Sequence, residues 1–195
     1  MKSTLFVLCL AALPMMAKES TGTCAQTFAV DVEPGQHLHM HLRSGEIRVT
    51  GTDEPRIVVT CGFRDDDPAL AHISFEQKAG GPELNVHGGP DNNFHVTVQV
   101  PRKSNLFLRV PAGEVKVNGV TGHKDVELHA GELDIDVGNP SSYAHADASV
   151  FTGEINASAF GVDKGGLFRS WSNDNPDGKY RLHAHVGAGE IRLTH

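Results

Sequence analysis

The sequence predicts an all-β fold, and within that class a β-solenoid (a single-stranded β-helix) with a less regular β N-terminal half or cap. Three observations support this prediction: a Gly-Glu-aliphatic motif recurs, each copy continues with period-two alternation, and the copies are regularly spaced. With 21 glycines in 195 residues, chance alone gives about one Gly-Glu pair, so a recurring pair marks an internal repeat. The copies start at Gly45, Gly113, Gly131, Gly153 and Gly189.

Apolar and polar residues alternate after each of these glycines. Val115 and Val117 would point to one side of a strand, while Glu114 and Lys116 would point to the other. Each copy is therefore predicted to be a strand with one face in water. The preceding glycine suits a corner where the backbone adopts a conformation forbidden to larger residues, or passes close to its neighbour.

The spacing of the copies favours stacked coils. Gly113 and Gly131 are 18 residues apart, Gly131 and Gly153 are 22 apart, and Gly153 and Gly189 are 36 apart, which is two units of 18. A chain that returns to one corner every ~20 residues can stack each strand ~4.8 Å from the previous one. We expect an interior ladder of Val115, Leu133, Ile155 and Ile191. The alternative is a sandwich of antiparallel hairpins, which also alternates but has no reason to repeat one motif at one corner.

The chain is expected to form a single domain over residues 26–195, with a less regular part at 26–100 and the regular Gly-Glu repeats at 101–195. Turns at Gly80-Gly81 and at 88–93 resemble hairpin chemistry, so the first part is expected to be a cap or a small antiparallel layer. Its predicted strands are Phe28–Val32, His37–Leu42, Ile47–Thr50, Ile57–Cys61, Ile73–Gln77, Leu84–His87 and Phe94–Val100.

The C-terminal region contains a polar stretch, Ser170–Gly178, which is predicted to be a protruding turn. The sequence stops within a copy of the motif, at Leu193-Thr194-His195. A last coil without a cap would leave an unpaired strand edge. We expect either a hairpin from Leu167 to Val186 to shield this edge, or a homodimer to form through it.

The first residues are typical of a signal peptide. Met1-Lys2-Ser3 precedes an apolar run from Leu5 to Ala17, which is too short to cross a bilayer as a mature helix. Residues 1–17 are the predicted signal peptide, with Ala25 as the latest cleavage position. The mature chain is then exported, periplasmic or extracellular, associated with the cell envelope and not membrane-spanning.

Two cysteines, Cys24 and Cys61, follow the predicted signal peptide. In an exported protein such a pair usually forms a disulfide. Processing after Ala17 keeps both thiols, whereas processing after Ala25 leaves Cys61 alone.

Histidine is frequent, with 12 residues, and three of them alternate with apolar residues over His37–Leu42. His37, His39 and His41 would share one strand face, with ~6.7 Å between successive residues. Neighbouring imidazoles could reach one Zn²⁺ or Cu²⁺, joined by His183 and His185 if the strands were adjacent. A solvated face is the favoured interpretation, because no cysteine or carboxylate stands at ligand spacing. No metal and no cofactor are expected.

Carboxylates recur at the position after each corner glycine. Glu114, Glu132 and Glu154 would stack into a column and repel one another, with relief from Lys116, Arg48 and Arg192 on the same face. Calcium or a basic partner could neutralise this column, although a solvated acidic face agrees with the net charge of −7. The predicted contact surface consists of Glu114, Lys116, Glu132, Asp134, Asp136, Glu154 and Asn156.

The alternative function is a polysaccharide-acting β-helix enzyme that uses the clustered carboxylates Glu132, Asp134 and Asp136. Alternate strand residues fall in the separation that glycoside hydrolysis requires. Aromatic platforms for sugar rings are scarce, with two Tyr and one Trp, and no Ser-His-Asp set or phosphate loop is found. An enzyme is therefore not expected. Nucleic-acid binding is not expected either, because the chain is acidic.

A family resemblance rests on these motifs. The segments that carry this resemblance are Glu33-Pro34-Gly35, Ser44 to Gly51, the later Gly-Glu repeats and the closing segment 179–193. Through them the chain resembles the bacterial putative-adhesin family of exported β-helical domains of unknown function. The resemblance covers most of the mature chain and implies an exported, β-helical, non-enzymatic protein, with no site residues to carry over. The expected function is that of an adhesin-like or scaffold protein whose extended surface contacts an envelope or extracellular protein or glycan.

Overall fold

The structure is a computed structural model that describes residues 19–62, 70–89 and 93–195; the predicted signal peptide lies outside these residues. The described residues form thirteen strands in one mixed sheet that does not close on itself. Two short 3₁₀ turns, η2 (Pro140–Ser142) and η3 (Ser158–Phe160), accompany them. The all-β prediction is confirmed. Among the described residues, no helix has the length and apolar character needed to cross a membrane.

The strands predicted before residue 101 are present. They are β2 (Phe28–Asp31), β3 (His37–Leu42), β4 (Gly45–Thr52), β5 (Arg56–Gly62), β6 (Ala71–Lys78), β7 (Gly81–Gly88) and β8 (His95–Pro101). A further strand, β1 (Glu19–Thr23), was not predicted; it pairs antiparallel with β6, which forms a hairpin with β7 around Gly80-Gly81.

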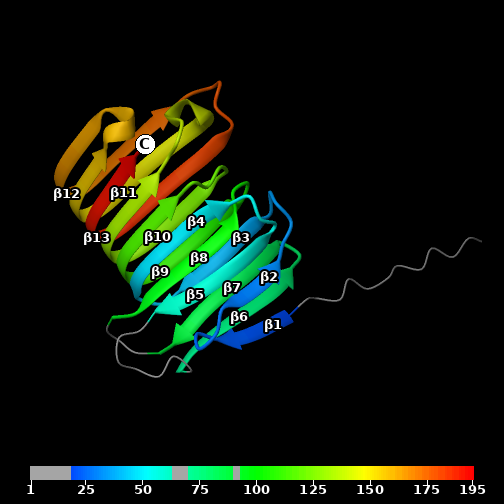
Figure 1. Ribbon diagram of the computed structural model, residues 1–195. Coiled ribbons are helices and arrows are strands. Elements are labelled where there is room, and N and C mark those ends of the chain that lie inside the picture. Colours follow the sequence, from blue (N-terminus) through cyan, green and yellow to red (C-terminus); the bar gives the residue numbers. More distant parts are fainter. Residues whose placement is uncertain (1–18, 63–69, 90–92) are drawn as a thin grey trace, which may run out of the picture.

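Five long strands follow: β9 (Asn105–Asn118), β10 (Lys124–Asp136), β11 (Tyr143–Ala157), β12 (Val162–Asp174) and β13 (Tyr180–Thr194). Four of them lie parallel in the order β9, β10, β13, β11, as Figure 1 shows. Their register places the corner glycines opposite one another, and Gly45 of β4 extends the same row beside Gly113.

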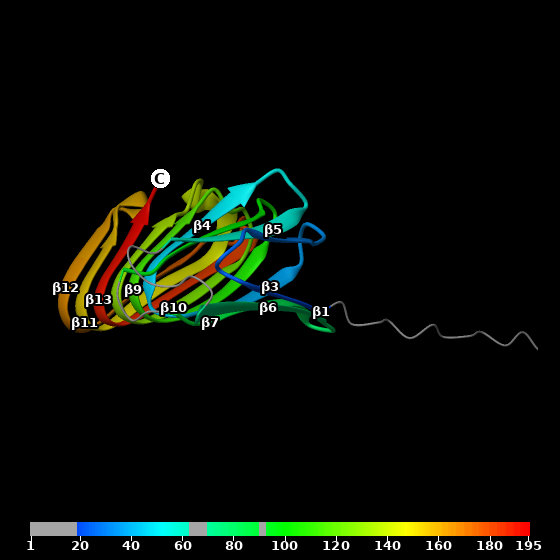
Figure 2. The same ribbon diagram turned by 60° about the horizontal axis from the view of Figure 1, so that its bottom comes forward.

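Each of these four parallel strands has two arms, the first before its corner glycine and the second after it. The first arm of β9 pairs with β3 and the second arm pairs with β4, so the sheet forks at β9 into two branches. Figure 2 shows the long strands curving around an interior. Both arms fill that interior: Leu106 and Leu108 are buried from the first arm of β9, and Val115 and Val117 from the second.

The corner requires glycine for two reasons. Gly131 has φ +131°, a region that L side chains rarely adopt, and a Cβ there would lie 1.9 Å from the carbonyl oxygen of Gly113. Gly189 repeats this relation with Gly131, at 1.8 Å. Each glycine therefore makes room for the backbone of the strand next to it. The corner glycines thus have both predicted roles: they adopt a conformation that larger residues rarely adopt, and they allow the neighbouring backbone to pass close by.

The interior ladder forms, but in a different order. Val115 faces Leu133, Leu133 faces Ile191, and Ile191 faces Ile155, so β13 lies between β10 and β11. Sequential winding would place β11 beside β10; a β-solenoid as predicted is therefore not what the strand order shows. The cause is the antiparallel pairing of β12 with β11, which returns the chain to the start of the first arms before β13 begins.

The C-terminal predictions need correction. β13 is an interior strand paired on both sides, β12 is the edge, and β12 and β13 do not pair, so the expected Leu167 to Val186 hairpin is absent. The predicted polar turn at Ser170–Gly178 is strand as far as Asp174. On β12, Leu167 and Phe168 are exposed, whereas Trp171 packs against Phe160, with 4.7 Å between the ring centroids.

The structure contains the predicted disulfide between Cys24 and Cys61, with 5.3 Å between the two Cα atoms. Cys24 follows β1, the last strand of one branch, and Cys61 belongs to β5 of the other branch. The bond therefore connects the two branches at the end of the stack that lies opposite β12.

Candidate functional site

The long strands present two outward faces, one on each arm. We call the outward residues of the second arms the acidic face and those of the first arms the histidine face. The acidic face comprises Glu46, Arg48, Glu114, Lys116, Glu132, Asp134, Glu190, Arg192, Glu154 and Asn156. The histidine face comprises His39, His41, Phe107, Arg109, Asp125, Glu127, His183, His185, Asp147 and Ser149.

The acidic face holds a row of five glutamates in register: Glu46, Glu114, Glu132, Glu190 and Glu154. The structure thus brings together the sequence-predicted contact residues Glu114, Lys116, Glu132, Asp134, Glu154 and Asn156. Asp136, at the end of β10, accepts a hydrogen bond from the Gly138 N–H at 2.8 Å.

Cations two residues further along the same strands neutralise part of this row. Arg192 contacts the carboxylates of Glu190 and Glu132 at 2.5 and 3.3 Å. Lys116 donates to Glu114, which lowers the pKa of that carboxyl and raises the pKa of the ammonium. Among the described residues, Glu154 has no ion pair. The row is therefore partly compensated and keeps excess negative charge.

The histidine face differs from strand to strand. One row, six residues before each corner glycine, runs His39, Phe107, Asp125, His183 and Asp147. The next row, four residues before the glycine, runs His41, Arg109, Glu127, His185 and Ser149.

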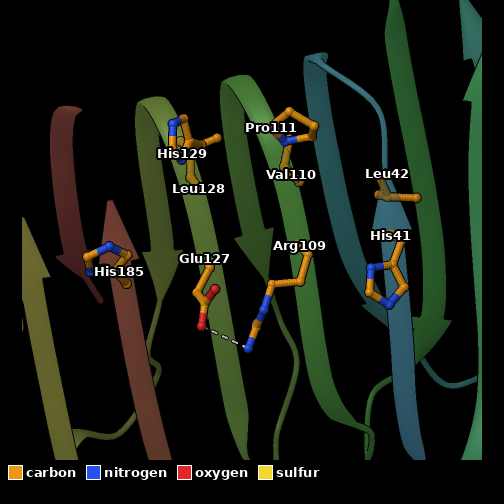
Figure 3. Close-up of a pocket in the computed structure, with 9 residues that line it drawn as sticks. All are labelled: His41, Leu42, Arg109, Val110, Pro111, Glu127, Leu128, His129 and His185. Carbon is orange, nitrogen blue, oxygen red and sulfur yellow. Dashed lines mark ion pairs between the residues drawn. The ribbon is translucent and has the colours of Figure 1, made fainter. Parts of the chain in front are cut away.

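A shallow hollow of ≈ 530 Å³ lies over β3, β9, β10 and β13 on this face. Figure 3 shows His41, His185 and His129 around it, with Arg109 paired to Glu127 at 3.0 Å. The Arg109 guanidinium lies 3.6 Å from the centroid of the Phe107 ring and donates to the carbonyl oxygens of Leu108 and Asp125 at 3.0 and 3.1 Å. These contacts fix Arg109 beside the carboxylates of β10.

Carboxylate and hydroxyl partners orient the histidines of β11 and β13. His183 Nδ1 lies 2.6 Å from Asp147 Oδ2, and His145 Nδ1 lies 2.6 Å from Asp174 Oδ1. The ring of His185 is held by Ser149 at 2.9 Å.

The structure places the candidate metal ligands His37, His39 and His41 on the outward side of β3. The rings of His39 and His41 pack against Phe107, at centroid distances of 5.0 and 6.1 Å. Within the part of the chain that the structure describes, the group with metal-ligand spacing is instead Asp125, Glu127 and His183, whose ligand atoms all lie within 4.8 Å of one another.

Sequence reasoning missed this group because β10 and β13 are not consecutive in the chain. Counting back from the corner glycine would have helped. Asp125 and His183 both stand six residues before their glycine, so aligning the repeats at the corner places them in one row.

A buried lysine lies beneath the same face. Lys124 is 1 % exposed and occupies the interior row between Leu106 and Leu182. Its ammonium donates to the Tyr143 hydroxyl at 2.5 Å, and burial lowers the pKa of Lys124 to about 8. Burial also raises the pKa of the Tyr143 phenol. The alternation pattern did not predict this residue, because it placed only aliphatic side chains inside.

Comparison with known proteins yields a single kind of finding, a similarity of fold. No protein-family model matches the chain, and no curated protein matches it. Among solved structures, the crystal structure of a "putative cell adhesion protein" from Clostridium sporogenes ATCC 15579 is similar, with a TM-score of 0.51 and 17% identity over 91% of this chain and 99% of that one. At this identity the similarity concerns the fold alone.

Proposed function

We propose that this chain is an exported, non-enzymatic, adhesin-like or scaffold protein that contacts an envelope or extracellular protein or glycan through its acidic face. The observation that carries the proposal is the in-register row of five glutamates, which repeats one chemical group at the strand spacing of ~4.8 Å along an extended surface. Such a row suits a partner with repeated basic or hydrogen-bonding groups.

Export is proposed from the amino-terminal segment together with the Cys24–Cys61 disulfide. Disulfides form and persist in oxidising compartments, which include the periplasm and the cell exterior. The structural similarity to a protein described as a cell adhesion protein supports the adhesin-like proposal only through the shared fold.

We propose that the fold is a solenoid with one rearrangement. It would have five successive layers, each with a corner glycine in the same row: β3 together with β4, then β9, β10, β13 and β11. The hairpin of β11 and β12 is an addition that moves the fourth Gly-Glu copy to the outside of the fifth.

The enzyme alternative depends on carboxylates that already have local partners. Glu132 pairs with Arg192, Asp134 accepts a hydrogen bond from the Thr194 hydroxyl at 3.3 Å, and Asp136 accepts from Gly138. These contacts favour a structural role for the three residues. Hydrolysis of any member of a polysaccharide panel by the purified chain would support the enzyme instead.

The homodimer was predicted to form through an unpaired edge at the C-terminal strand, but β13 is paired on both sides, so that edge is absent and β12 is the edge strand at this end of the sheet. Arg169 donates to the Gly165 carbonyl at 2.7 Å and Lys164 donates to the Ser170 carbonyl at 3.3 Å, so cationic side chains cover this edge. Charged edges discourage pairing with another sheet. Sedimentation at several concentrations tests the prediction, and a monomer throughout would contradict it.

The contact proposal can be tested with matched charge changes. Immobilised basic proteins, matrix proteins and envelope glycans are probed with the wild type and with the triple variant Glu132→Gln, Asp134→Asn, Asp136→Asn. We expect the triple variant to lose at least about tenfold in affinity for a probe that the wild type binds, because it removes three charges from one face.

The control variant is Asp31→Asn, Glu33→Gln, Glu54→Gln. It removes the same formal charge from exposed positions away from the acidic face, and we expect it to bind like the wild type. Equal losses in both variants would show that net charge, rather than the acidic face, drives binding.

A further inference from the structure

We propose that Asp125, Glu127 and His183 form a binding site for a divalent transition-metal ion, specifically Zn²⁺. Their three ligand atoms already lie within 4.8 Å of one another, on the outward side of neighbouring strands β10 and β13. Zn²⁺ binds imidazole nitrogen and carboxylate oxygen at about 2.0–2.2 Å, and three protein ligands with water in the fourth position form a common site. Small side-chain movements therefore suffice to close the group around an ion.

A second observation points to a metal independently of this proximity. Asp147, on the opposite side of β13 from Asp125, lies 2.6 Å from His183 through Nδ1. When Nδ1–H donates to a carboxylate, Nε2 carries the lone pair that a metal needs. Metal-binding histidines usually have this kind of partner, which fixes the tautomer and raises the basicity of the ligand.

The Asp125 carboxylate is held at the site by an ion pair. Its Oδ1 atom is buried and lies 2.8 Å from Arg109 Nη2. An ion that binds Asp125 would therefore share this carboxylate with Arg109.

Arg109 sets a limit on affinity. Its guanidinium contacts both Asp125 and Glu127, so it holds the two carboxylates together and also neutralises part of the charge that attracts a cation. Because Arg109 is fixed by Phe107 and by two carbonyl oxygens, the ion must bind in its presence. We therefore infer that Arg109 weakens Zn²⁺ binding and that its removal strengthens it.

The ligand types select the metal. Two carboxylates alone would suit Ca²⁺ or Mg²⁺, which take oxygen ligands. Imidazole shifts the preference to Zn²⁺ and its neighbours in the transition series. Dependence on His183 is consequently the property that separates this site from general attraction of cations to an acidic surface.

The experiment measures Zn²⁺ binding to the metal-stripped, untagged chain by titration calorimetry and equilibrium dialysis. We expect one saturable site in the wild type, at least a hundredfold weaker binding in His183→Gln, and about 10–100-fold weaker binding in Asp147→Asn. Arg109→Gln should bind at least about tenfold more tightly. The matched control is His185→Gln, which removes an imidazole two residues further along the same strand face and should bind like the wild type.

Three results would overturn the proposal: no saturable Zn²⁺ binding in the wild type, equal losses in His183→Gln and His185→Gln, or equally tight binding of Ca²⁺. Circular dichroism and the melting temperature of each variant without metal show whether it is folded. Since the readout is metal binding, failure here leaves the adhesin-like proposal untouched, and failure of that proposal leaves this one untouched.

Discussion

The acidic face and the histidine face belong to the same long strands but follow the repeat to different degrees. After the corner glycine, five strands carry the same residue, glutamate. Before the corner, the corresponding row changes from His39 to Phe107, Asp125, His183 and Asp147. Both arms bury equivalent aliphatic rows, so packing alone does not explain why only one outer face is uniform.

The two faces therefore differ in the kind of binding that they can support. A uniform row can contact a partner at any point along it, and its charges are partly compensated within the row by Arg192 and Lys116. A varied row can bring unlike groups together at one point, as it does with Asp125 and His183. Extended contact therefore fits the acidic face, and a localised site fits the histidine face.

The largest expected effect comes from the corner that both faces share. Gly131→Ala would place a Cβ 1.9 Å from the Gly113 carbonyl oxygen at φ +131°. Backbone strain costs about 1–3 kcal/mol, and the clash with a neighbouring backbone adds to it, so we expect a loss of about 4 kcal/mol or more in unfolding free energy. Denaturant unfolding measures the loss.

Gly138→Ala is the control for the corner. Gly138 also has a positive φ, +64°, but a Cβ there meets nothing within 4 Å. Only the backbone cost of about 1–2 kcal/mol should remain. Equal losses in the two variants would mean that close strand approach at the corner contributes nothing.

The next effect concerns the disulfide that joins the two branches. Cys24 and Cys61 are separated by 37 residues, and closing a loop of that length in the unfolded chain is worth about 4 kcal/mol in the chain-entropy account. The double variant Cys24→Ser, Cys61→Ser should lose about 2–4 kcal/mol in unfolding free energy. Reductant should shift the melting temperature of the wild type and leave that of the double variant unchanged.

The third test uses the lysine beneath the histidine face. Because the pKa of Lys124 falls to about 8 in the folded chain from 10.5, the folded state releases its proton first as pH rises. Stability should therefore increase between pH 8 and about 10, by up to about 3 kcal/mol. The raised pKa of Tyr143 acts in the opposite direction only above its ordinary value of 10.0, so the window below pH 10 isolates the lysine.

Lys124→Met checks the assignment by removing the titrating group from the interior row. Its unfolding free energy should be nearly flat from pH 8 to 9.5 where that of the wild type rises. A wild-type rise that persists in the variant would assign the effect to another group.

The smallest effect is expected on the acidic face. Arg192→Gln leaves Glu190 and Glu132 without their cation. Glu132 and Arg192 are exposed and Glu190 is half-buried, and ion pairs in water-accessible positions contribute about 0.2–1 kcal/mol. We expect a loss below about 1 kcal/mol at low salt that disappears near ~1 M salt. Glu154→Gln, at a position with no ion pair among the described residues, should be neutral or slightly stabilising.

The sequence was sufficient to predict the features that depend on the repeat itself. Alternation predicted the buried row of Val115 and its equivalents, and glycine spacing predicted the corner. Neither pattern could predict the order of the layers, because Ile155 and Ile191 are equally suitable neighbours for Leu133 in the buried row. The order depends on β12, whose exposed pairing with β11 carries no periodic signal.

The candidate site divides in the same way. Glu114 and Glu132 could be placed in one row because each follows a corner glycine. The proximity of Asp125, His183 and Asp147 follows from the position of β13 between β10 and β11, so it required the strand order. Lys124 was missed because the alternation pattern assigns only aliphatic side chains to the interior. The hydrogen bond to the Tyr143 hydroxyl accommodates its amine there, and that contact is visible only in the structure.

The position of β13 between β10 and β11 has a consequence for folding during synthesis. Because synthesis proceeds from the amino terminus, β10 and β11 are synthesised before β13, the strand that separates them. The two strands must either remain unpaired with each other until β13 is present, or pair transiently and then separate so that β13 can insert. A nascent chain halted before Tyr180 should therefore lack the native neighbours of β10 and β11, and synthesis of the final segment would be the step that completes the sheet.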